Sequence, residues 1–244
     1  MNIALVGYGK MGKEVEQVAL ERGWTARVRL TSQSDFPSSQ VIRGIDVVVH
    51  FARAADVERH VAEWAKAGKP LVIGTTGWGS SMDTVRKLIE QAGTGLVYSS
   101  NFSLGMHIFQ RIVKHAGALI NRFEDYDIGI QETHHKEKAD SPSGTALTLG
   151  NLLLNQIARK SELLTGTPQG AVKPAQLQIS SARTGNVVGT HSVLFDSAAD
   201  AIELTHRAKN RRGFALGALL AAEWIHHRTG FYSFEEVMAQ LLDI

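Results

Sequence analysis

The chain of 244 residues contains no cysteine. Disulfide bonds, thiolate metal sites and a cysteine nucleophile are therefore excluded. No apolar run approaches the ~20 residues that a membrane-spanning helix needs. The apolar start of the chain, Ile3 to Val6, breaks at Gly7, which is too early for a signal peptide. We therefore expect a soluble, cytoplasmic protein with no membrane partner.

Neither sign of charge predominates, since 26 Lys and Arg residues face 24 Asp and Glu residues and leave a net charge of +2. This balance does not indicate a surface for nucleic acid, although a small anionic substrate needs only a local cluster of cations. The hydrophobic content of 43% excludes a disordered chain. The length suits two domains, because single cores usually stop growing near about 250 residues.

In the first hundred residues, short apolar runs alternate with amphipathic stretches. Strands are predicted at 3–6, 25–30, 47–49, 71–73 and 96–98, and helices at 11–22, 54–67 and 82–92. Continuous β-branched runs that alternate with helical periods indicate a parallel sheet covered on both faces. We therefore predict a doubly wound, Rossmann-like α/β domain over residues 1–102.

The pattern changes after residue 102. Helices are predicted at 106–119, 144–159 and 214–227, and strands at 126–132, 177–183, 187–195 and 201–207, with a loop around 166–174. The last three strands follow one another across short turns, which favours an antiparallel meander. We predict a second, α+β domain over 103–212 with a mostly antiparallel or mixed sheet, and we expect residues 213–244 to rejoin the first domain.

The segment Gly7-Tyr8-Gly9-Lys10-Met11-Gly12 is a G-x-G-x-x-G motif between a predicted strand and a predicted helix. Gly7 permits the tight turn, Gly9 lets the backbone approach a pyrophosphate, and Gly12 lets helix and strand pack closely. The start of the helix adds free N–H groups and a favourable dipole. We therefore predict that this loop binds a dinucleotide. The alternative is a tight turn that binds nothing.

Two further turns follow predicted strands, at the edge where ligands of open α/β sheets bind. They are Gly74-Thr75-Thr76-Gly77 after the fourth strand and Ser99-Ser100-Asn101-Phe102-Ser103 after the fifth. Their glycine and hydroxyl residues suit contact with a nicotinamide ribose. Either turn, taken alone, also fits ordinary loop chemistry.

The second predicted strand ends without the acidic residue that normally hydrogen-bonds a ribose 2′-hydroxyl. Its end reads Arg29-Leu30-Thr31-Ser32, and the first carboxylate after it is Asp35. A 2′-phosphate is therefore not repelled. Five nearby cations and hydroxyls could bind such a phosphate: Lys10, Arg27, Arg29, Thr31 and Ser32. We expect NADPH to be accepted at least as well as NADH.

A segment rich in histidine and lysine runs from Glu132 to Thr145, between a predicted strand and a predicted helix. Ser143-Gly144-Thr145 is predicted to begin the helix with Ser143 as its cap, so that free N–H groups can hold a carboxylate. Lys138 adds a full charge, and His134 and His135 can donate hydrogen bonds or protons. The combination favours a receptor for a small dianion over a solvated run of charges.

No metal site is predicted. His191 or His206 could join His134 and His135, but no spacing matches a known structural zinc site, and adjacent histidines chelate one ion poorly because they point to opposite sides. The other histidines lie in helical or strand patterns and are predicted to be structural or exposed: His50, His60, His107, His115, His226 and His227.

With these residues the chain resembles the 4-hydroxy-tetrahydrodipicolinate reductase (dihydrodipicolinate reductase) family over essentially its whole length. The most specific match is E-T-H-H-K-E-K-A-D-S-P-S-G-T-A, from Glu132 to Ala146. Four other stretches fall where the family has its own versions: G-T-T-G at 74–77, S-N-F-S at 100–103, R-T-G-N-V-V-G-T-H at 183–191 and F-A-L-G-A from 214.

The resemblance implies reduction of the 4-hydroxy substrate to tetrahydrodipicolinate with NADPH or NADH, on the route to diaminopimelate and lysine. By similarity, His134 is the proton donor or acceptor and Lys138 the proton donor. His135 and the backbone of Gly144-Thr145 would bind the substrate carboxylates. The cofactor would contact residues 7–12, 74–76 and 100–103. The family is similar in being tetrameric through the sheets of its second domains, which implies a homotetramer. Thr31 stands where many relatives carry Asp or Glu.

Two other interpretations stay open. A different Rossmann-type dehydrogenase, acting for example on aspartate or homoserine, would need other catalytic residues in the second domain. A regulatory module that senses NAD(P)H without turnover would leave the cationic loop without a purpose.

Overall fold

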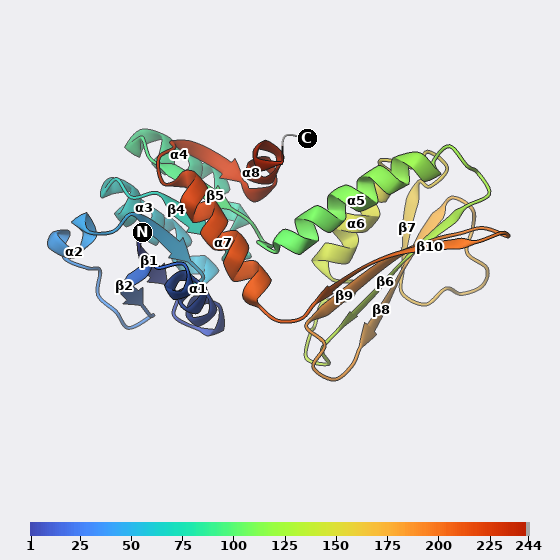
Figure 1. The fold of residues 1–244 in the computed structure, drawn as a ribbon, viewed down its shortest axis with the longest axis horizontal. Helices are drawn as coiled ribbons and strands as arrows, with labels where there is room; N and C mark the ends of the chain where they lie inside the picture. Colours follow the sequence, from blue (N-terminus) through green and yellow to red (C-terminus); the bar gives the residue numbers. More distant parts are fainter. Residues whose placement is uncertain (243–244) are drawn as a thin grey trace. The chain divides into compact units, whose positions relative to one another are not determined.

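The structure is a computed structural model that describes residues 1–242 (Figure 1). It divides into two compact units. Unit 1 comprises Met1–Leu104 and the segment from Arg211 on, and unit 2 comprises Gly105–Asn210. Residues 243–244, which we expect to rejoin the first domain with the rest of the C-terminal segment, lie outside the described residues. Within residues 1–242, no helix combines the length and the apolar character needed to cross a membrane.

Unit 1 is built on a six-stranded parallel sheet in the order β11-β5-β4-β3-β1-β2. Its strands are β1 (Asn2–Val6), β2 (Thr25–Leu30), β3 (Val47–His50), β4 (Leu71–Ile73), β5 (Gly95–Tyr98) and β11 (Gly230–Ser233). The central strands are almost wholly buried because both faces of the sheet are covered. This arrangement confirms the predicted Rossmann-like fold.

Helices cover both faces of this sheet and form two separate cores (Figure 1). One core contains α1 (Lys10–Glu21), α7 (Arg212–Ile225) and α8 (Phe234–Leu241), and the other contains α2 (Ser39–Arg43), α3 (Val57–Lys66) and α4 (Met82–Ala92). Successive residues of a strand point to opposite faces of the sheet and so pack in different cores. Val47 and Val49 pack in the first core, and Val48 packs in the second.

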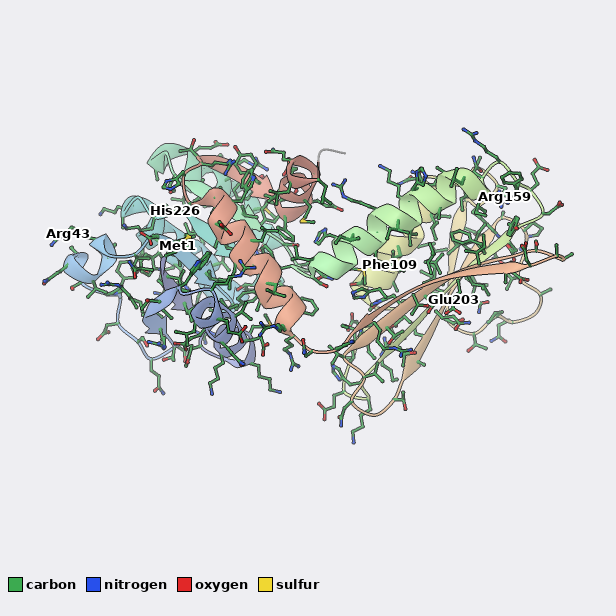
Figure 2. All side chains as sticks on the ribbon, in the orientation of Figure 1. Met1, Arg43, Phe109, Arg159, Glu203 and His226 are labelled. Carbon is green, nitrogen blue, oxygen red and sulfur yellow. The ribbon has the colours of Figure 1, made fainter. Side chains whose placement is uncertain are left out.

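Unit 2 has a five-stranded mixed sheet in the order β10-β9-β6-β8-β7. Its strands are β6 (Asp127–His134), β7 (Glu162–Thr165), β8 (Gln176–Arg183), β9 (Gly189–Asp196) and β10 (Ala201–Ala208). Two helices, α5 (Leu104–Ile120) and α6 (Gly144–Leu154), pack side by side on one face (Figure 1). Figure 2 labels Phe109, a buried residue of α5 in this core, and Glu203, an exposed residue of β10.

The α+β class and the mixed sheet of unit 2 are confirmed, but the predicted meander is wrong. β8 and β9 follow one another in sequence without pairing, because β6 lies between them. β6 is parallel to β8 and antiparallel to β9, so only β9 and β10 form an antiparallel hairpin. The apolar residues of β6, Ile128 and Ile130, pack in the core of unit 2. Their burial favours a central position for β6, between β8 and β9, although β6 comes earlier in the sequence than both.

Several elements lie outside the predictions. α2, β7, β11 and α8 were not predicted, and each is short or lies at the edge of its sheet. The predicted helix 54–67 begins as a 3₁₀ turn at Ala54–Asp56 before α3, and the predicted helix 144–159 ends at Leu154. These differences concern short elements, edge strands and the ends of helices, and they leave the central strands of both sheets as predicted.

The packing of α7 yields a stability prediction. A Cβ added to Gly217 would lie 1.8 Å from the carbonyl oxygen of Phe102, so Gly217→Ala must push α7 away from the chain there. We expect the free energy of unfolding to fall by about 3 kcal/mol. Gly213→Ala is the matched control in the same helix, since its Cβ would meet only Ser103 Oγ at 3.7 Å. Urea denaturation compares them, and equal effects would contradict the close contact.

Candidate functional site

The three glycines of the G-x-G-x-x-G loop have different surroundings. Gly7 has a φ of +92° and a Cβ there would lie 2.3 Å from the carbonyl oxygen of Phe51. A Cβ on Gly12 would lie 2.3 Å from the carbonyl oxygen of Gly7. A Cβ on Gly9 would meet nothing within 4 Å. Gly7 and Gly12 therefore permit close packing inside the protein, whereas Gly9 faces open space that a ligand can approach.

The start of α1 keeps its N–H groups available. Its N-cap is Gly9, which provides no side-chain hydrogen bond, and the first turn contains no acidic residue. The free N–H groups and the positive end of the helix dipole suit an anionic group such as a pyrophosphate. Open space at Gly9 beside an uncapped helix is the arrangement that a dinucleotide requires, so the residues present fit this cofactor.

The cations near the end of β2 are already engaged. Arg29 donates from Nε to Glu16 Oε1 at 2.9 Å, and the Tyr8 hydroxyl bonds the same carboxylate. The Arg29 guanidinium holds the pKa of Glu16 below its ordinary value, so the pair is ionised. Arg27 Nε donates to Asn2 Oδ1 at 2.9 Å. The two arginines that the sequence offers to a 2′-phosphate therefore have partners within unit 1.

The turn after β2 contains hydroxyl groups. Thr31 N donates to Ser34 Oγ at 2.9 Å, and Gln33 N donates to Thr31 Oγ1 at 3.3 Å. Both hydroxyl residues are exposed. The structure thus presents hydroxyls at the position where a carboxylate would exclude a 2′-phosphate.

The other two predicted cofactor turns also lie at carboxyl ends of strands in unit 1. A Cβ on Gly74 would lie 2.0 Å from the ring of Phe51, whose carbonyl oxygen contacts Gly7. Thr75 is buried and Thr76 is exposed. The turns after β1, β3 and β4 therefore pack against one another in a row, through Gly7, Phe51 and Gly74.

The turn after β5 is shaped by its own side chains. Asn101 N donates to Ser99 Oγ at 3.0 Å, and Ser103 N donates to Asn101 Oδ1 at 2.9 Å. Ser100 is exposed, whereas Phe102 is 1% exposed and packs in the first core. The backbone of this turn and Ser100 are therefore better placed to meet a ligand than the ring of Phe102.

In unit 2, the Glu132 carboxylate is the centre of the histidine-rich segment. Glu132 lies on β6 and is 2% exposed. Its Oε1 accepts hydrogen bonds from Arg183 Nη2 at 2.8 Å and from Ser143 N at 3.3 Å, and its Oε2 accepts a short bond from His134 Nδ1. One carboxylate thus joins β6, β8 and the start of α6.

Burial and hydrogen bonding act in opposite directions on this group. Burial raises the pKa of Glu132, but the hydrogen bonds from Arg183 and His134 oppose burial, and the pKa lies below its ordinary value. Burial lowers the pKa of His134, and Glu132 only partly offsets this. At neutral pH Glu132 is therefore a carboxylate and His134 a neutral imidazole. Because a carboxylate only accepts, the His134 proton sits on Nδ1 and Nε2 carries a lone pair.

His191 on β9 completes the buried cluster. Its Nε2 lies 3.2 Å from Ser143 Oγ, and its ring stands edge-on to that of His134 at 5.1 Å between centroids. Burial lowers the pKa of His191 to about 4. Ser143 Oγ also accepts from Ala146 N, which confirms the predicted helix cap. Ser143, which the sequence predicts as part of the substrate-binding helix start, thus has a side chain that is buried and already hydrogen-bonded.

The exposed side of the segment carries the remaining predicted residues. Lys138 Nζ lies 2.7 Å from Asp140 Oδ1, and the lysine side chain is 24% exposed. His135 is half-buried, and Gly144 at the start of α6 is exposed. The loop therefore presents an ammonium group, an imidazole and a helix start to its surroundings, while His134 faces the buried carboxylate.

Glu132, His134 and His191 could in principle hold a metal ion, since their ligand atoms lie within 4.8 Å of one another. Both oxygens of Glu132, however, already accept hydrogen bonds, one of them from the Arg183 guanidinium. A guanidinium beside the carboxylate opposes a second cation. The arrangement is built as a hydrogen-bond network.

Sequence reasoning missed Glu132 and Arg183 as functional candidates and considered His191 only as a metal ligand. One signal was present, because Glu132 and His134 are two residues apart on a strand and so share a face. The pairing of His134 with Arg183 and of Glu132 with His191 depends on strand register, which no local pattern contains.

Comparison with known proteins gives a match along both units. A family model described as dihydrodipicolinate reductase, N-terminus, matches residues 1–102, and one described as dihydrodipicolinate reductase, C-terminus, matches residues 105–238. A 4-hydroxy-tetrahydrodipicolinate reductase of Christiangramia forsetii is 35% identical over 241 residues, which is 99% of each chain. Another, of Neisseria meningitidis serogroup B, is 31% identical over 91% of this chain and 83% of its own length.

A solved structure has a similar fold. It is a dipicolinate-bound dihydrodipicolinate reductase from Paenisporosarcina sp. TG-14, with a TM-score of 0.76 over 97% of this chain and 99% of that one. The sequence identity is 22%, so this likeness concerns the fold.

The buried carboxylate yields a prediction about stability and pH. Glu132→Gln leaves the Arg183 guanidinium without its counter-charge, and we expect a loss of about 3 kcal/mol of unfolding free energy near neutral pH. Because folding lowers the pKa of Glu132, its contribution is complete above the ordinary carboxyl range and disappears as the pH falls through the folded-state pKa. Urea denaturation at neutral and acid pH measures the difference.

Glu137→Gln is the control, because Glu137 is an exposed carboxylate of the same segment. Equal destabilisation by the two substitutions would contradict a special role of the buried Glu132 carboxylate. So would a difference in unfolding free energy between wild type and Glu132→Gln that grows toward acid pH.

Proposed function

The chain belongs to the dihydrodipicolinate reductase family, and from that premise we propose that it acts as an NAD(P)H-dependent 4-hydroxy-tetrahydrodipicolinate reductase. It reduces its substrate to tetrahydrodipicolinate in diaminopimelate and lysine biosynthesis, and the 4-hydroxyl group of the substrate leaves as water. The observation that carries the proposal is the segment from Glu132 to Thr145, where a buried carboxylate orients His134 while Lys138 and the start of α6 stay accessible.

Each unit has a proposed task. Unit 1 binds the dinucleotide at the carboxyl ends of its strands, and unit 2 binds the substrate and forms the oligomer. The proposed cofactor contacts are Gly7, Tyr8, Gly9, Lys10, Met11, Gly12, Thr31, Gly74, Thr75, Thr76, Ser100, Asn101, Phe102 and Ser103. When bound, the reduced nicotinamide supplies a hydride. We place the reaction in the cytoplasm, where biosynthetic NAD(P)H is available.

The substrate is a dicarboxylate, and the segment offers matching groups. His135 and the N–H groups of Gly144 and Thr145 bind its carboxylates, with Ser143 holding the start of α6 in place. Lys138 donates a proton to the ring so that the product never carries a full negative charge on carbon. The ion pair with Asp140 keeps the ammonium group on the loop while it is charged.

His134 handles the second proton. With Nδ1 bonded to Glu132, the opposite nitrogen, Nε2, is the atom that can accept or return a proton. Gly189 leaves room beside this atom, since a Cβ there would already lie 3.0 Å from His134 Nε2. The absence of a side chain at Gly189 thus favours access to the nitrogen.

We also propose a homotetramer that assembles through the sheets of unit 2. Family resemblance supports it, and so does the face of that sheet opposite α5 and α6. On this face Thr190, Ser192 and Leu194 are only partly covered, whereas the intervening residues of β9 are buried.

The direct test is a coupled assay. The upstream synthase generates the substrate from aspartate-semialdehyde and pyruvate, and the fall in NADPH absorbance reports its reduction. We expect turnover that depends on both the synthase and this chain. NADPH oxidation with aspartate-semialdehyde or another amino-acid precursor but not with the synthase product would instead favour a different dehydrogenase.

Substitutions in the segment test the division of labour. Lys138→Ala and His134→Ala should each lower kcat at least about a hundredfold, because each removes a proton-transfer group. The Kd for NADPH should stay within about twofold of wild type, since both residues lie in unit 2 and the proposed dinucleotide contacts lie in unit 1. Lys136→Ala, an exposed cation of the same segment, is the control. Equal loss of NADPH affinity in both variants would count against the proposal.

The hydroxyl-lined turn after β2 predicts cofactor preference. We expect kcat/KM with NADPH to be at least as high as with NADH, because no carboxylate repels the 2′-phosphate at Thr31. Thr31→Asp should shift the ratio toward NADH by roughly tenfold, which corresponds to about 1.4 kcal/mol. A strong preference of the wild-type chain for NADH would refute this prediction.

A further inference from the structure

Two histidines of unit 1 that the sequence indicated as merely structural or exposed form a hydrogen-bonded chain with the turn after β4. His50, the last residue of β3, is 0% exposed. Its Nδ1 lies 2.8 Å from Thr75 Oγ1 and its Nε2 lies 2.9 Å from His60 Nδ1, on α3. The chain continues at both ends, from Arg59 Nη2 to His60 Nε2 at 3.1 Å and from Thr75 Oγ1 to Ala52 O at 3.2 Å.

The direction of every bond follows from the Arg59 end. A guanidinium only donates, so His60 Nε2 accepts and a neutral His60 carries its proton on Nδ1. His60 Nδ1 then donates to His50 Nε2, which places the His50 proton on Nδ1. His50 Nδ1 in turn donates to Thr75 Oγ1.

The Ala52 end requires the same direction independently. A carbonyl oxygen only accepts, so the Thr75 hydroxyl donates to Ala52 O and must accept from His50. Both ends therefore assign one tautomer, with the proton on Nδ1, to His50 and to His60. Any other arrangement sets two donors or two acceptors against each other.

The chain needs both imidazoles to be neutral, and their surroundings keep them so. Burial lowers the pKa of His50 to about 3, and the neighbouring His60 adds to this. Burial also lowers the pKa of His60, and the charge of Arg59 acts in the same direction. The other charged groups that act on His60 partly cancel: Asp56 and Glu63 favour its charged form and Arg53 opposes it.

The chain fastens the turns that face the proposed cofactor site. Ala52 belongs to the turn after β3 and Thr75 to the turn after β4, while Gly7, Phe51 and Gly74 pack against one another beside them. The hydroxyl of Thr75 is directed into the protein, so this turn offers a ligand its backbone and the exposed Thr76. A small displacement of either turn would alter the surface that meets the dinucleotide.

We propose that His50 and His60 are positioning residues for the dinucleotide, which hold the turns after β3 and β4 together through one unidirectional hydrogen-bond chain. This proposal rests on the proposed function, because it takes the ligand of these turns to be the nicotinamide dinucleotide. Neither histidine touches the cofactor in this account, and both act through Thr75.

The first measurement concerns the hydrogen-bond chain alone and needs no ligand. Long-range proton–nitrogen NMR correlation of the ¹⁵N-labelled chain distinguishes the two neutral histidine tautomers. We expect His50 and His60 both to carry the proton on Nδ1, the less common form in free histidine. A proton on Nε2 of either ring, or a charged His60 at neutral pH, would overturn the chain.

The second measurement compares variants at His60, which is half-buried and tolerates change better than His50. His60→Leu removes the donor to His50, whereas His60→Asn keeps an N–H near the position of Nδ1. We expect His60→Leu to raise the Kd and the KM for NADPH roughly fivefold, the scale of one buried hydrogen bond. At saturating NADPH its kcat should change less than about twofold, and His60→Asn should restore most of the affinity.

His227→Leu is the matched control, because His227 is an exposed histidine of the same unit. Unchanged NADPH affinity in His60→Leu, or equal impairment in His60→Asn, would overturn the positioning role, since the second result indicates packing alone. A wild-type chain that bound no dinucleotide would overturn the proposed function and the link to the cofactor with it. The tautomer measurement would still decide whether the hydrogen-bond chain from Arg59 to Ala52 exists.

Discussion

The candidate site of unit 2 depends on one buried carboxylate, that of Glu132. It accepts hydrogen bonds from the Arg183 guanidinium, the His134 ring and the backbone of Ser143, so it joins two strands to the start of α6. A carboxylate so surrounded stays ionised despite its burial and imposes one tautomer on His134. The loop that carries Lys138 is thereby held at both ends by a single side chain.

The two units present different kinds of groups to their proposed ligands, backbone N–H groups in unit 1 and charged or imidazole side chains in unit 2. In the proposed function, unit 1 would bind the dinucleotide mostly through its backbone, at the open position of Gly9, the uncapped helix α1 and the closely packed turns, while Arg29 is paired with Glu16. Unit 2 would bind the proposed dicarboxylate beside the charge of Lys138 and the imidazole groups of the same segment. A pyrophosphate suits many oriented N–H groups, whereas proton transfer needs a few groups with set protonation states.

Local patterns predicted most of the fold, because the central strands of unit 1 are continuous apolar runs such as Val47 to Val49. Such a run indicates a strand that is buried on both faces of a parallel sheet. They failed where pairing is non-local. β6 lies between β8 and β9, and the short edge strand β11 pairs with β5, which lies far from it in the sequence. The same limit applies to the site: the motif predicts roles for His134 and Lys138, but only strand register brings Arg183 and His191 to Glu132.

The Glu132 carboxylate keeps the pKa of His134 above the value that burial alone would give, and an NMR titration of the His134 ring protons tests this most directly. Burial lowers the pKa of His134, and the Glu132 carboxylate opposes burial by accepting its Nδ1 proton. Replacing the carboxylate with a neutral amide in Glu132→Gln should therefore lower the pKa of His134 further. A pKa that stayed the same or rose in Glu132→Gln would contradict the central place given to this carboxylate.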